Sequence, residues 1–269
     1  MRSGSEVRSR RQVTIHPTAL VHPDAELGEG VEIGPYTIIT GTVKIGPGTI
    51  VGARVMIEGY TTLGAENEIF TGAVLGSRTQ DKKFDGGISY LKIGDRNKIR
   101  EYVTINPGTK AETETVIGND NLLMAYSHVA HDCALHNRTT LANVATLAGH
   151  VIVEDGAIIG GLSAVHQFVK IGKMALIGGC SKVVQDVPPY VIADGHPAKA
   201  HGINLVGLER AGFSSADKQV IKKAYKIIFK SGMTLKKSVA ALRREFPSSN
   251  PHLADLIQFL NQAERGICR

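Results

Sequence analysis

Apolar residues recur along this 269-residue chain with a period of six. Ile, Leu or Val occupies every sixth position from Ile15 to Leu75, from Ile93 to Ile105 and from Ile117 to Val183, which makes 26 positions. Glycine often follows directly, and the residue four places on is mostly small or β-branched. A period of six matches neither an amphipathic helix nor an alternating strand. It predicts a solenoid of short strands joined by sharp bends, where glycine relieves backbone strain.

Two interruptions of the period are whole multiples of six, so the repeat keeps its phase across them. After Leu75 the next member is Ile93 in place of position 81, and after Ile105 it is Ile117 in place of position 111. We therefore expect loops that leave the solenoid near residues 77–92 and 106–116. Such loops either carry function or are tolerated surface insertions, and both interpretations remain open at this stage.

The hexads resemble the repeat of left-handed parallel β-helix proteins, in which three hexads form one triangular coil. This resemblance implies the handedness, and 26 hexads would form between eight and nine coils. We expect a mainly β fold: a β-helix over residues 13–197 after a basic extension at 1–12, followed by a small α-helical domain at 198–269.

Helical periodicity replaces the hexads after Pro188-Pro189. Ser214 suits the N-cap of a first helix over residues 215–231, which ends at Gly232. A second helix is expected from Thr234 to Phe246. A third should begin after Asn250, with proline at its first position, and end at Gly266.

Positive charge is concentrated in this helical segment. Residues 198–269 contain 13 Lys and Arg against 5 Asp and Glu, a net charge of +8, so the formal excess of +6 on the whole chain comes from this segment. Five lysines form a stripe on one helix face: Lys218, Lys222, Lys223, Lys226 and Lys230. An acidic partner would explain a stripe of like charges, but a merely solvated face is equally compatible with it.

Composition excludes several classes of protein. Aromatic residues make up only 5% of the chain and we find no nucleic-acid motif, which disfavours nucleic acid as a partner. No apolar run is long enough to cross a bilayer, so we expect no membrane span. The three cysteines, Cys133, Cys180 and Cys268, form neither a zinc pattern nor a disulfide framework, and a reducing cytoplasm is the simplest setting.

Histidines gather where three coils would stack. In a coil of three hexads, His131, Gly149 and Gln167 share one column, while Asp132, His150 and Phe168 share the next. An imidazole can accept a hydroxyl proton near neutral pH, and a glycine N–H can stabilise an oxyanion. These are parts for acyl transfer. Because no serine or cysteine has an evident paired base, we favour direct transfer.

Two alternatives remain. His131 and His136 have the H-x4-H spacing of the zinc-dependent carbonic anhydrases that share this repeat, and Asp95 lies two coils earlier as a candidate third ligand. The absence of a suitable third histidine makes us predict no metal. The other alternative is a hexapeptide scaffold without catalytic activity.

Four motifs resemble one enzyme family specifically. They are DNLLMAYSHVAHDC at 120–133, LAGH at 147–150, GGLSAVHQF at 160–168 and QDVPPYVIADG at 185–195. They are similar to the acyl-carrier-protein:UDP-N-acetylglucosamine O-acyltransferases, which begin lipid A synthesis, and the likeness extends over about residues 13–269. The related N-acyltransferase of this pathway carries an extra N-terminal domain, for which hexads that begin at Ile15 leave no room.

The resemblance implies transfer of an (R)-3-hydroxyacyl chain from acyl carrier protein to the sugar 3-hydroxyl. It implies that His131 is the general base, that Asp132 supports it and that the Gly149 N–H stabilises the oxyanion. The substrate groove would be lined by His128, His150, His166 and Gln167. The acyl chain would be delivered on the phosphopantetheine of the carrier protein, and no other cofactor is implied.

Further implied roles lie outside the histidine cluster. Asp81 and Lys83 would reach the sugar nucleotide across a subunit boundary of a homotrimer, and Gly179 would act as the ruler of acyl length. Asn204 and Arg210 would contact uridine diphosphate, although Val206 and Ala211 replace charged residues of the family pattern. The lysine stripe would receive the acidic carrier protein in the cytoplasm.

Overall fold

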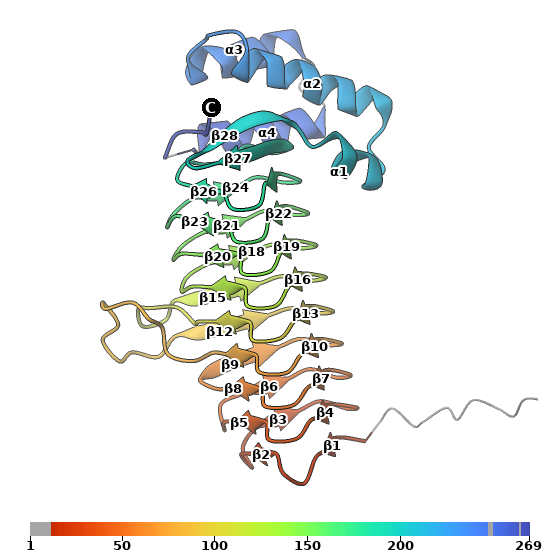
Figure 1. The fold of residues 1–269 in the computed structure, drawn as a ribbon, viewed down its shortest axis with the longest axis vertical. Helices are drawn as coiled ribbons and strands as arrows, with labels where there is room; N and C mark the ends of the chain where they lie inside the picture. Colours follow the sequence, from red (N-terminus) through yellow and green to blue (C-terminus); the bar gives the residue numbers. More distant parts are fainter. Residues whose placement is uncertain (1–11, 247–249, 264) are drawn as a thin grey trace, which may run out of the picture.

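The computed structural model describes residues 12–246, 250–263 and 265–269. The expected basic extension at 1–12 therefore lies outside the described residues except for its last position. The described chain forms a tall, three-sided coil with helices stacked on its C-terminal end (Figure 1). No helix in these ranges is long and apolar enough to cross a bilayer.

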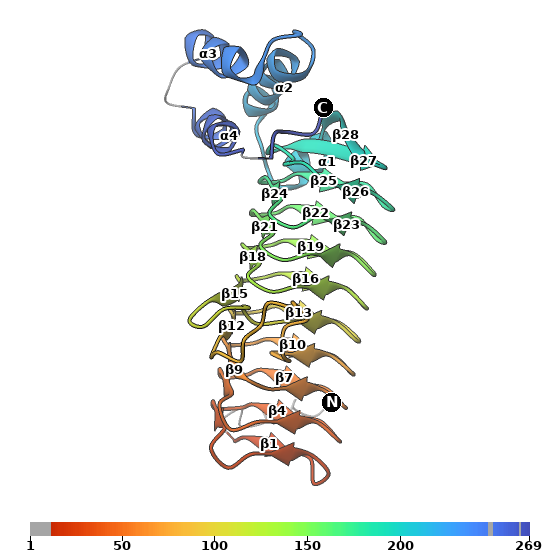
Figure 2. The same ribbon diagram turned by 90° about the vertical axis from the view of Figure 1, so that its left-hand side faces the viewer.

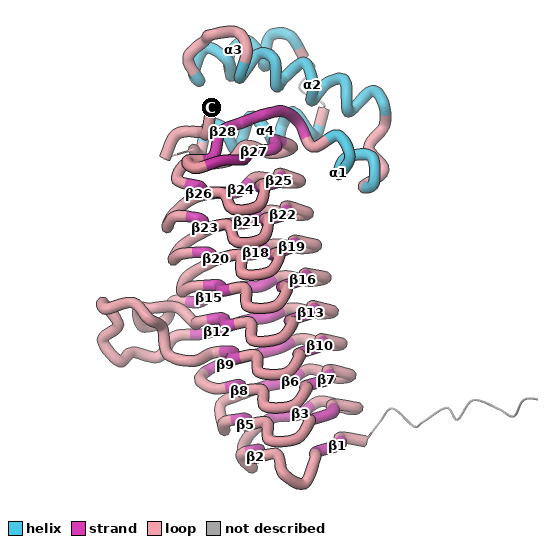
Figure 3. Tube along the Cα trace, viewed as in Figure 1, coloured by secondary structure: helices cyan, strands magenta, loops and turns pink. Residues whose placement is uncertain are grey.

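Three sheets form the sides of the coil, and their strands are mostly two residues long (Figure 3). In spatial order, the first sheet comprises β1 (Thr14–Ile15), β4 (Glu32–Ile33), β7 (Ile50–Val51), β10 (Glu68–Ile69), β13 (Lys98–Ile99), β16 (Leu122–Leu123), β19 (Thr140–Leu141), β22 (Ile158–Ile159), β25 (Leu176–Ile177), β27 (Val191–Gly195) and β28 (Ala198–Ile203). The second comprises β2 (Leu20–Val21), β5 (Ile38–Ile39), β8 (Met56–Ile57), β11 (Val74–Leu75), β14 (Thr104–Ile105), β17 (His128–Val129), β20 (Thr146–Leu147), β23 (Ala164–Val165) and β26 (Lys182–Val183). The third comprises β3 (Glu26–Leu27), β6 (Lys44–Ile45), β9 (Tyr60–Leu63), β12 (Tyr90–Ile93), β15 (Glu114–Ile117), β18 (Ala134–Leu135), β21 (Ile152–Val153) and β24 (Lys170–Ile171).

Parallel pairing at a step of three hexads confirms the coil expected from the sequence. Thr14 pairs with Glu32 in the first sheet, and Thr146 pairs with Ala164 in the second. From β4 to β26 the hexad residue ends each strand and is buried, so that a continuous aliphatic core runs up the axis. The chain is thus a left-handed parallel β-helix with a helical C-terminal part.

Both insertions preserve the register, as their lengths predict. Across the first insertion β10 pairs with β13, so Glu68 faces Lys98 at a step of five hexads. Across the second, Lys98 faces Leu122 at a step of four hexads. The inserted segments protrude together from one side of the coil (Figure 1). They also bond to each other, because the Glu112 N–H donates to the Ile88 carbonyl at 2.8 Å.

The C-terminal segment expected at 198–269 begins with a strand, which lies ahead of the helices that we expected there. β27 and β28 form an antiparallel hairpin that extends the first sheet beyond the last coil. A short helix α1 (Leu205–Arg210), which the periodicity did not predict, follows. The hexad pattern could not predict this hairpin. Its backbone N–H and C=O groups pair between antiparallel strands, and that pairing requires no six-residue period.

Three longer helices agree with the expected caps (Figure 2). They are α2 (Ser215–Phe229), capped by Ser214 with a capping box, α3 (Leu235–Glu245) and α4 (Pro251–Asn261). α4 ends well before Gly266, where we expected its end. The chain after Gln262 instead returns to the coil, where the Cys268 N–H donates to the Asp186 carbonyl at 2.9 Å.

Candidate active site

Three successive turns between the second and third sheets build the candidate site. We call these turns, at residues 130–133, 148–151 and 166–169, the site corner. Each contains a non-glycine residue with left-handed backbone, namely Asp132, His150 and Phe168, with φ of 57°, 60° and 66°. Such backbone is costly for residues with a Cβ and persists where surrounding structure enforces it. The ladder on either side provides that constraint and stacks the three turns.

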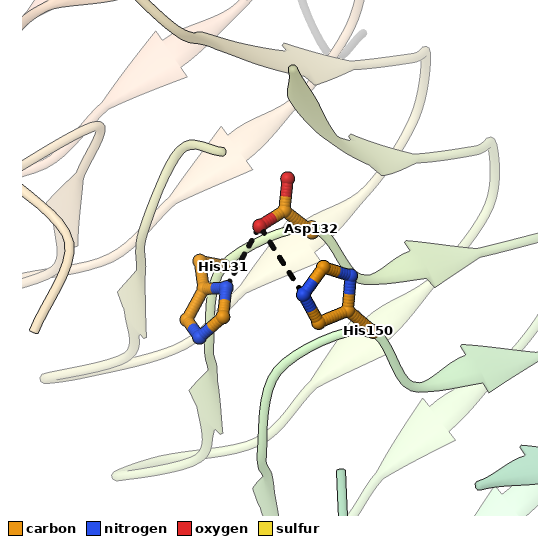
Figure 4. Close-up of side chains that lie close together, drawn as sticks. All are labelled: His131, Asp132 and His150. Carbon is orange, nitrogen blue, oxygen red and sulfur yellow. Dashed lines mark hydrogen bonds and ion pairs between the residues drawn. The ribbon is translucent and has the colours of Figure 1, made fainter. Parts of the chain in front are cut away.

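His131 and Asp132 form a hydrogen-bonded pair. His131 Nδ1 lies 2.8 Å from Asp132 Oδ2, and both side chains are largely buried (Figure 4). Burial alone would raise the pKa of the Asp132 carboxyl. Hydrogen bonds from the His131 ring and the Thr109 N–H, with the nearby Thr113 hydroxyl, outweigh this effect and hold the pKa below its usual range. An ionised carboxylate only accepts, so Nδ1 carries the proton and Nε2 is left as the base.

Gly149 lies directly against this imidazole, as the column of the coil predicted. A Cβ added at Gly149 would collide with the His131 ring, because it would lie 2.5 Å from Nε2. Glycine is therefore required for the ring to occupy its place. Among the described residues, the Gly149 N–H has no backbone acceptor. A base and a free amide donor are thus adjacent, which suits attack on a carbonyl carbon.

His150 is a second imidazole beside the same carboxylate. Its Nε2 lies 3.7 Å from Asp132 Oδ2, so that the carboxylate stands between two imidazole rings (Figure 4). Burial lowers the pKa of His150, and the nearby Asp132 charge offsets part of that change. Phe168 stacks on the His150 ring, with ring centroids 4.6 Å apart and planes 10° apart. The stacked ring and the carboxylate near Nε2 together restrict the orientation of His150.

His128 lies on the outer face of β17, the strand that leads directly into the turn with His131 and Asp132. Its Nδ1 is 2.7 Å from the Thr104 hydroxyl of the adjacent strand β14. Burial lowers the pKa of His128, and the neighbouring His131 adds to that effect. His128 is thus neutral at pH 7 and suits hydrogen bonding more than proton transfer.

The first insertion brings a second carboxylate to the base. Asp81 Oδ2 lies 3.5 Å from His131 Nε2, within one chain. The first insertion therefore folds back along its own coil. The implied contact of Asp81 with a sugar nucleotide across a subunit boundary stays a prediction. The Asp81 Oδ1 atom accepts from the Lys83 N–H at 3.0 Å, while the Lys83 side chain is exposed. A hydroxyl placed between Asp81 and His131 would meet two acceptors.

Other predicted residues lie apart from this centre or are otherwise engaged. His166 and Gln167 are exposed at the top of the site corner, and His166 Nδ1 is 3.1 Å from the Gln167 carbonyl. Gly179 is exposed in a turn between the first and second sheets, where an added Cβ would lie 3.4 Å from the Gly161 carbonyl oxygen. A Cβ at Gly179 would therefore meet no steric conflict within this chain, and its role in acyl length stays a prediction.

Asn204 and Arg210 occupy opposite ends of α1. Asn204 is buried and is the N-cap: its side-chain oxygen accepts from the Gly207 N–H at 3.0 Å, and its Nδ2 donates to the Met174 carbonyl at 3.0 Å. These bonds leave Asn204 little capacity for a ligand. Arg210 is exposed in the last turn of α1 and is free to meet an anion.

The lysine stripe lies on the outer face of α2. Lys222, Lys223, Lys226 and Lys230 are exposed and Lys218 is half-buried. The opposite face of α2 packs inward. Within the described ranges none of these lysines forms an ion pair, so their charge is available to a partner.

The metal alternative takes a different form from the one the spacing indicated. His136 and Asp95 lie in turns between the third and first sheets, away from the site corner, and Asp95 already accepts from the Ala65 N–H at 2.7 Å. The ligand atoms that do converge belong to His131, Asp132 and His150, all within 4.8 Å of one another. The alternative set of His131, His136 and Asp95 therefore does not come together.

Several neighbours of the site were not foreseen. Thr104 orients His128, and Thr79 and Thr109 connect the insertions to the pair. Phe168, by contrast, stacks on His150 as their shared column predicted. The threonines of the insertions leave no periodic signal.

Comparisons with known proteins agree with the geometry. A family model described as Udp N-acetylglucosamine O-acyltransferase; Domain 2 matches residues 186–268. The acyl-[acyl-carrier-protein]–UDP-N-acetylglucosamine O-acyltransferase of Thiobacillus denitrificans is 52% identical over 257 residues, covering 95% of this chain and 99% of that protein. The enzyme of the same name from Herminiimonas arsenicoxydans is 51% identical over 259 residues, with the same two coverages.

Solved structures give the same result. LpxA from Acinetobacter baumannii matches with a TM-score of 0.90 and 43% identity over 95% of this chain and 99% of that one. The UDP-N-acetylglucosamine O-acyltransferase of Moraxella catarrhalis matches with a TM-score of 0.90 and 39% identity, again over 95% and 99%. The likeness includes the coil, its insertions and the helical end.

Proposed function

This chain belongs to the acyl-[acyl-carrier-protein]–UDP-N-acetylglucosamine O-acyltransferase family, and from that membership we propose that it carries out the first step of lipid A biosynthesis. It transfers an (R)-3-hydroxyacyl chain from acyl carrier protein to the 3-hydroxyl of UDP-N-acetylglucosamine. The observation that carries this proposal is the contact of the His131–Asp132 pair with the backbone of Gly149.

The proposed reaction uses His131 as a general base. His131 Nε2 takes the proton of the sugar 3-hydroxyl while the hydroxyl oxygen attacks the thioester carbonyl carbon. Asp132 stabilises the imidazolium that forms. The carbonyl oxygen becomes an oxyanion, which the Gly149 N–H stabilises. When the intermediate collapses, the carbon–sulfur bond breaks, and the phosphopantetheine thiolate receives the proton held by His131. The products are the sugar ester and the free thiol.

Binding roles follow from position. Asp81, His128 and His150 lie near the base and would hold the sugar nucleotide and the thioester, together with the exposed Lys83, and with His166 and Gln167 two coils above His131. Arg210 would bind the diphosphate. Asn204 would act indirectly, since it caps the helix that carries Arg210. Gly179 would set the acyl length, because a side chain there would narrow the path.

The partners follow from charge and exposed apolar surface. In the cytoplasm, the acidic acyl carrier protein would dock on the lysine stripe. Its phosphopantetheine would carry the acyl chain and would be the sole cofactor. A homotrimer is supported by exposed apolar side chains along the turns between the first and second sheets. There Tyr102 and Tyr126 stack at 5.1 Å, and Leu162 is 63% exposed.

Replacing the base tests the function. Purified His131→Ala should transfer acyl groups from acyl carrier protein to UDP-N-acetylglucosamine about 10²–10⁴-fold more slowly than the unchanged protein, measured by mass spectrometry of the product. His136→Ala is the matched control, because it removes a histidine outside the site corner, and it should retain full activity. A His131→Ala protein that works at the full rate would rule out this mechanism.

A further inference from the structure

Two buried threonines connect the insertions to the catalytic pair. The Asp81 N–H donates to Thr79 Oγ1 at 3.2 Å, and Thr79 Oγ1 lies 3.1 Å from Thr109 Oγ1. The Thr109 N–H then donates to Asp132 Oδ2 at 3.2 Å. Thr79 belongs to the first insertion and Thr109 to the second, so the link joins both loops to the coil.

The link ends at the catalytic base. Asp132 Oδ2 accepts from His131 Nδ1 at 2.8 Å, and on the other side of the imidazole His131 Nε2 lies 3.5 Å from Asp81 Oδ2. Because Nε2 carries no proton, these two acceptors do not bond to each other. The threonine contacts are therefore a hydrogen-bonded route by which the Asp81 loop is attached to the pair.

Burial distinguishes the two threonines from ordinary loop residues. Thr79 is 5% exposed and Thr109 is 4% exposed, although both belong to segments that protrude from the coil. Buried hydroxyls are costly unless they are hydrogen-bonded, and each of these has the other as its side-chain partner. The loops also pack closely near them, since the Ser89 hydroxyl donates to the Gly108 carbonyl at 2.6 Å.

We propose that Thr79 and Thr109 are positioning residues that hold the Asp81 loop at a set distance from the His131 base. This inference rests on the proposed function, because it assigns the loop a task in binding the sugar nucleotide. The second insertion then has a function of its own, because it supports the first insertion through the contact between Thr109 and Thr79. Neither threonine touches the reacting atoms.

Thr109 contacts Thr79 through its hydroxyl and Asp132 through its backbone N–H. Removing only the hydroxyl therefore tests the positioning of the loop without removing the hydrogen bond to Asp132. Thr109→Val keeps the N–H that bonds Asp132 and loses only the link to Thr79. We expect the KM for UDP-N-acetylglucosamine to rise about fivefold, the typical effect of one lost hydrogen bond, with an unchanged KM for acyl carrier protein. The pH profile of kcat should not move. Thr109→Ser restores the hydroxyl and should restore the KM.

Two further variants give the comparison its reference points. Thr115→Val removes a hydroxyl that is equally buried in the same region but has no partner among the described residues, and it should leave both KM values unchanged. In an Asp81→Ala background, Thr109→Val should add no further rise in KM, because its effect passes through Asp81.

The rate of trypsin cleavage tests the anchoring of the first insertion independently of enzyme activity. Lys82 and Lys83 are exposed trypsin sites in the first insertion. If the threonine link anchors the loop, Thr109→Val should be cut there about fivefold faster, while the coil stays intact. An unchanged cleavage rate together with an unchanged KM would overturn the inference. Loss of transfer in the unchanged protein would instead refute the proposed function, so the two failures are distinguishable.

Discussion

The coil and the helical end of this protein hold their functional groups in different ways. In the coil, each buried aliphatic residue recurs at a fixed step, so side chains on the outer surface inherit regular spacing. The helical end has a separate core between α2, α3 and α4, and its outer face carries dispersed charge. A rigid ladder suits groups that must meet within hydrogen-bond distance, whereas a lysine surface tolerates imprecise placement.

The largest expected effect tests the placement of groups on the ladder. In Gly149→Ala, the new Cβ would displace the His131 ring from its position beside Asp132. We expect kcat to fall about 10²–10³-fold, with only a small loss of stability because a side chain yields more readily than backbone. Steady-state kinetics and thermal unfolding measure the two effects.

The control for this change is another glycine. A Cβ at Gly202 would meet no atom within 4 Å, so Gly202→Ala should retain its activity. If Gly149→Ala also kept its kcat, close packing of the ring against the backbone would not matter for catalysis.

Core truncations test whether the two regions are separate. Leu141 in the coil and Leu242 in the helical end are both fully buried. Each Leu→Ala change should cost about 2–5 kcal/mol of unfolding free energy. Hydrogen exchange should show faster opening near β19 for Leu141→Ala, but only in α2–α4 for Leu242→Ala. Equal loss of protection throughout the chain in both variants would show that the regions unfold as one.

Charge reversal tests whether the lysine stripe of α2 binds acyl carrier protein. A Lys222→Glu, Lys226→Glu double variant should raise the KM for acyl carrier protein about tenfold at low salt, with kcat unchanged, and the difference should shrink as salt is added. The same reversal at Lys236 and Lys237 of α3 is the control. If both pairs have equal effects, the α2 stripe is not a specific docking surface.

The smallest effect concerns pH. Burial lowers the pKa of His128, so below the ordinary histidine value of about 6.5 the unfolded chain binds more protons than the folded one. Stability is therefore lost as pH falls through that range, and the lowered pKa of Asp132 extends the loss to more acidic pH. In His128→Gln the decline of the melting temperature from pH 7.5 to 5.5 should be about 2–4 °C smaller. An unchanged decline would contradict the assignment, and His136→Gln serves as the exposed control.

Much of the site could be predicted because it lies on the periodic part of the chain. Counting in steps of three hexads was enough to bring His131 beside Gly149 and Asp132 beside His150, and the structure confirms both contacts. Caps such as Ser214 located helix starts by the same kind of local rule. Predictions failed where no local rule applied, as at the hairpin of β27 and β28.

The sequence by itself determined the period, the register across both insertions and the columns of the site corner, since each depends on spacing alone. Only the tertiary structure decided how the insertions fold back, so that Asp81 reaches His131 of its own chain and Thr79 meets Thr109. It also decided that Asn204 is engaged as a cap. The physical reason is that a ladder repeats one local geometry, whereas loop closure depends on contacts between residues that share no repeating step.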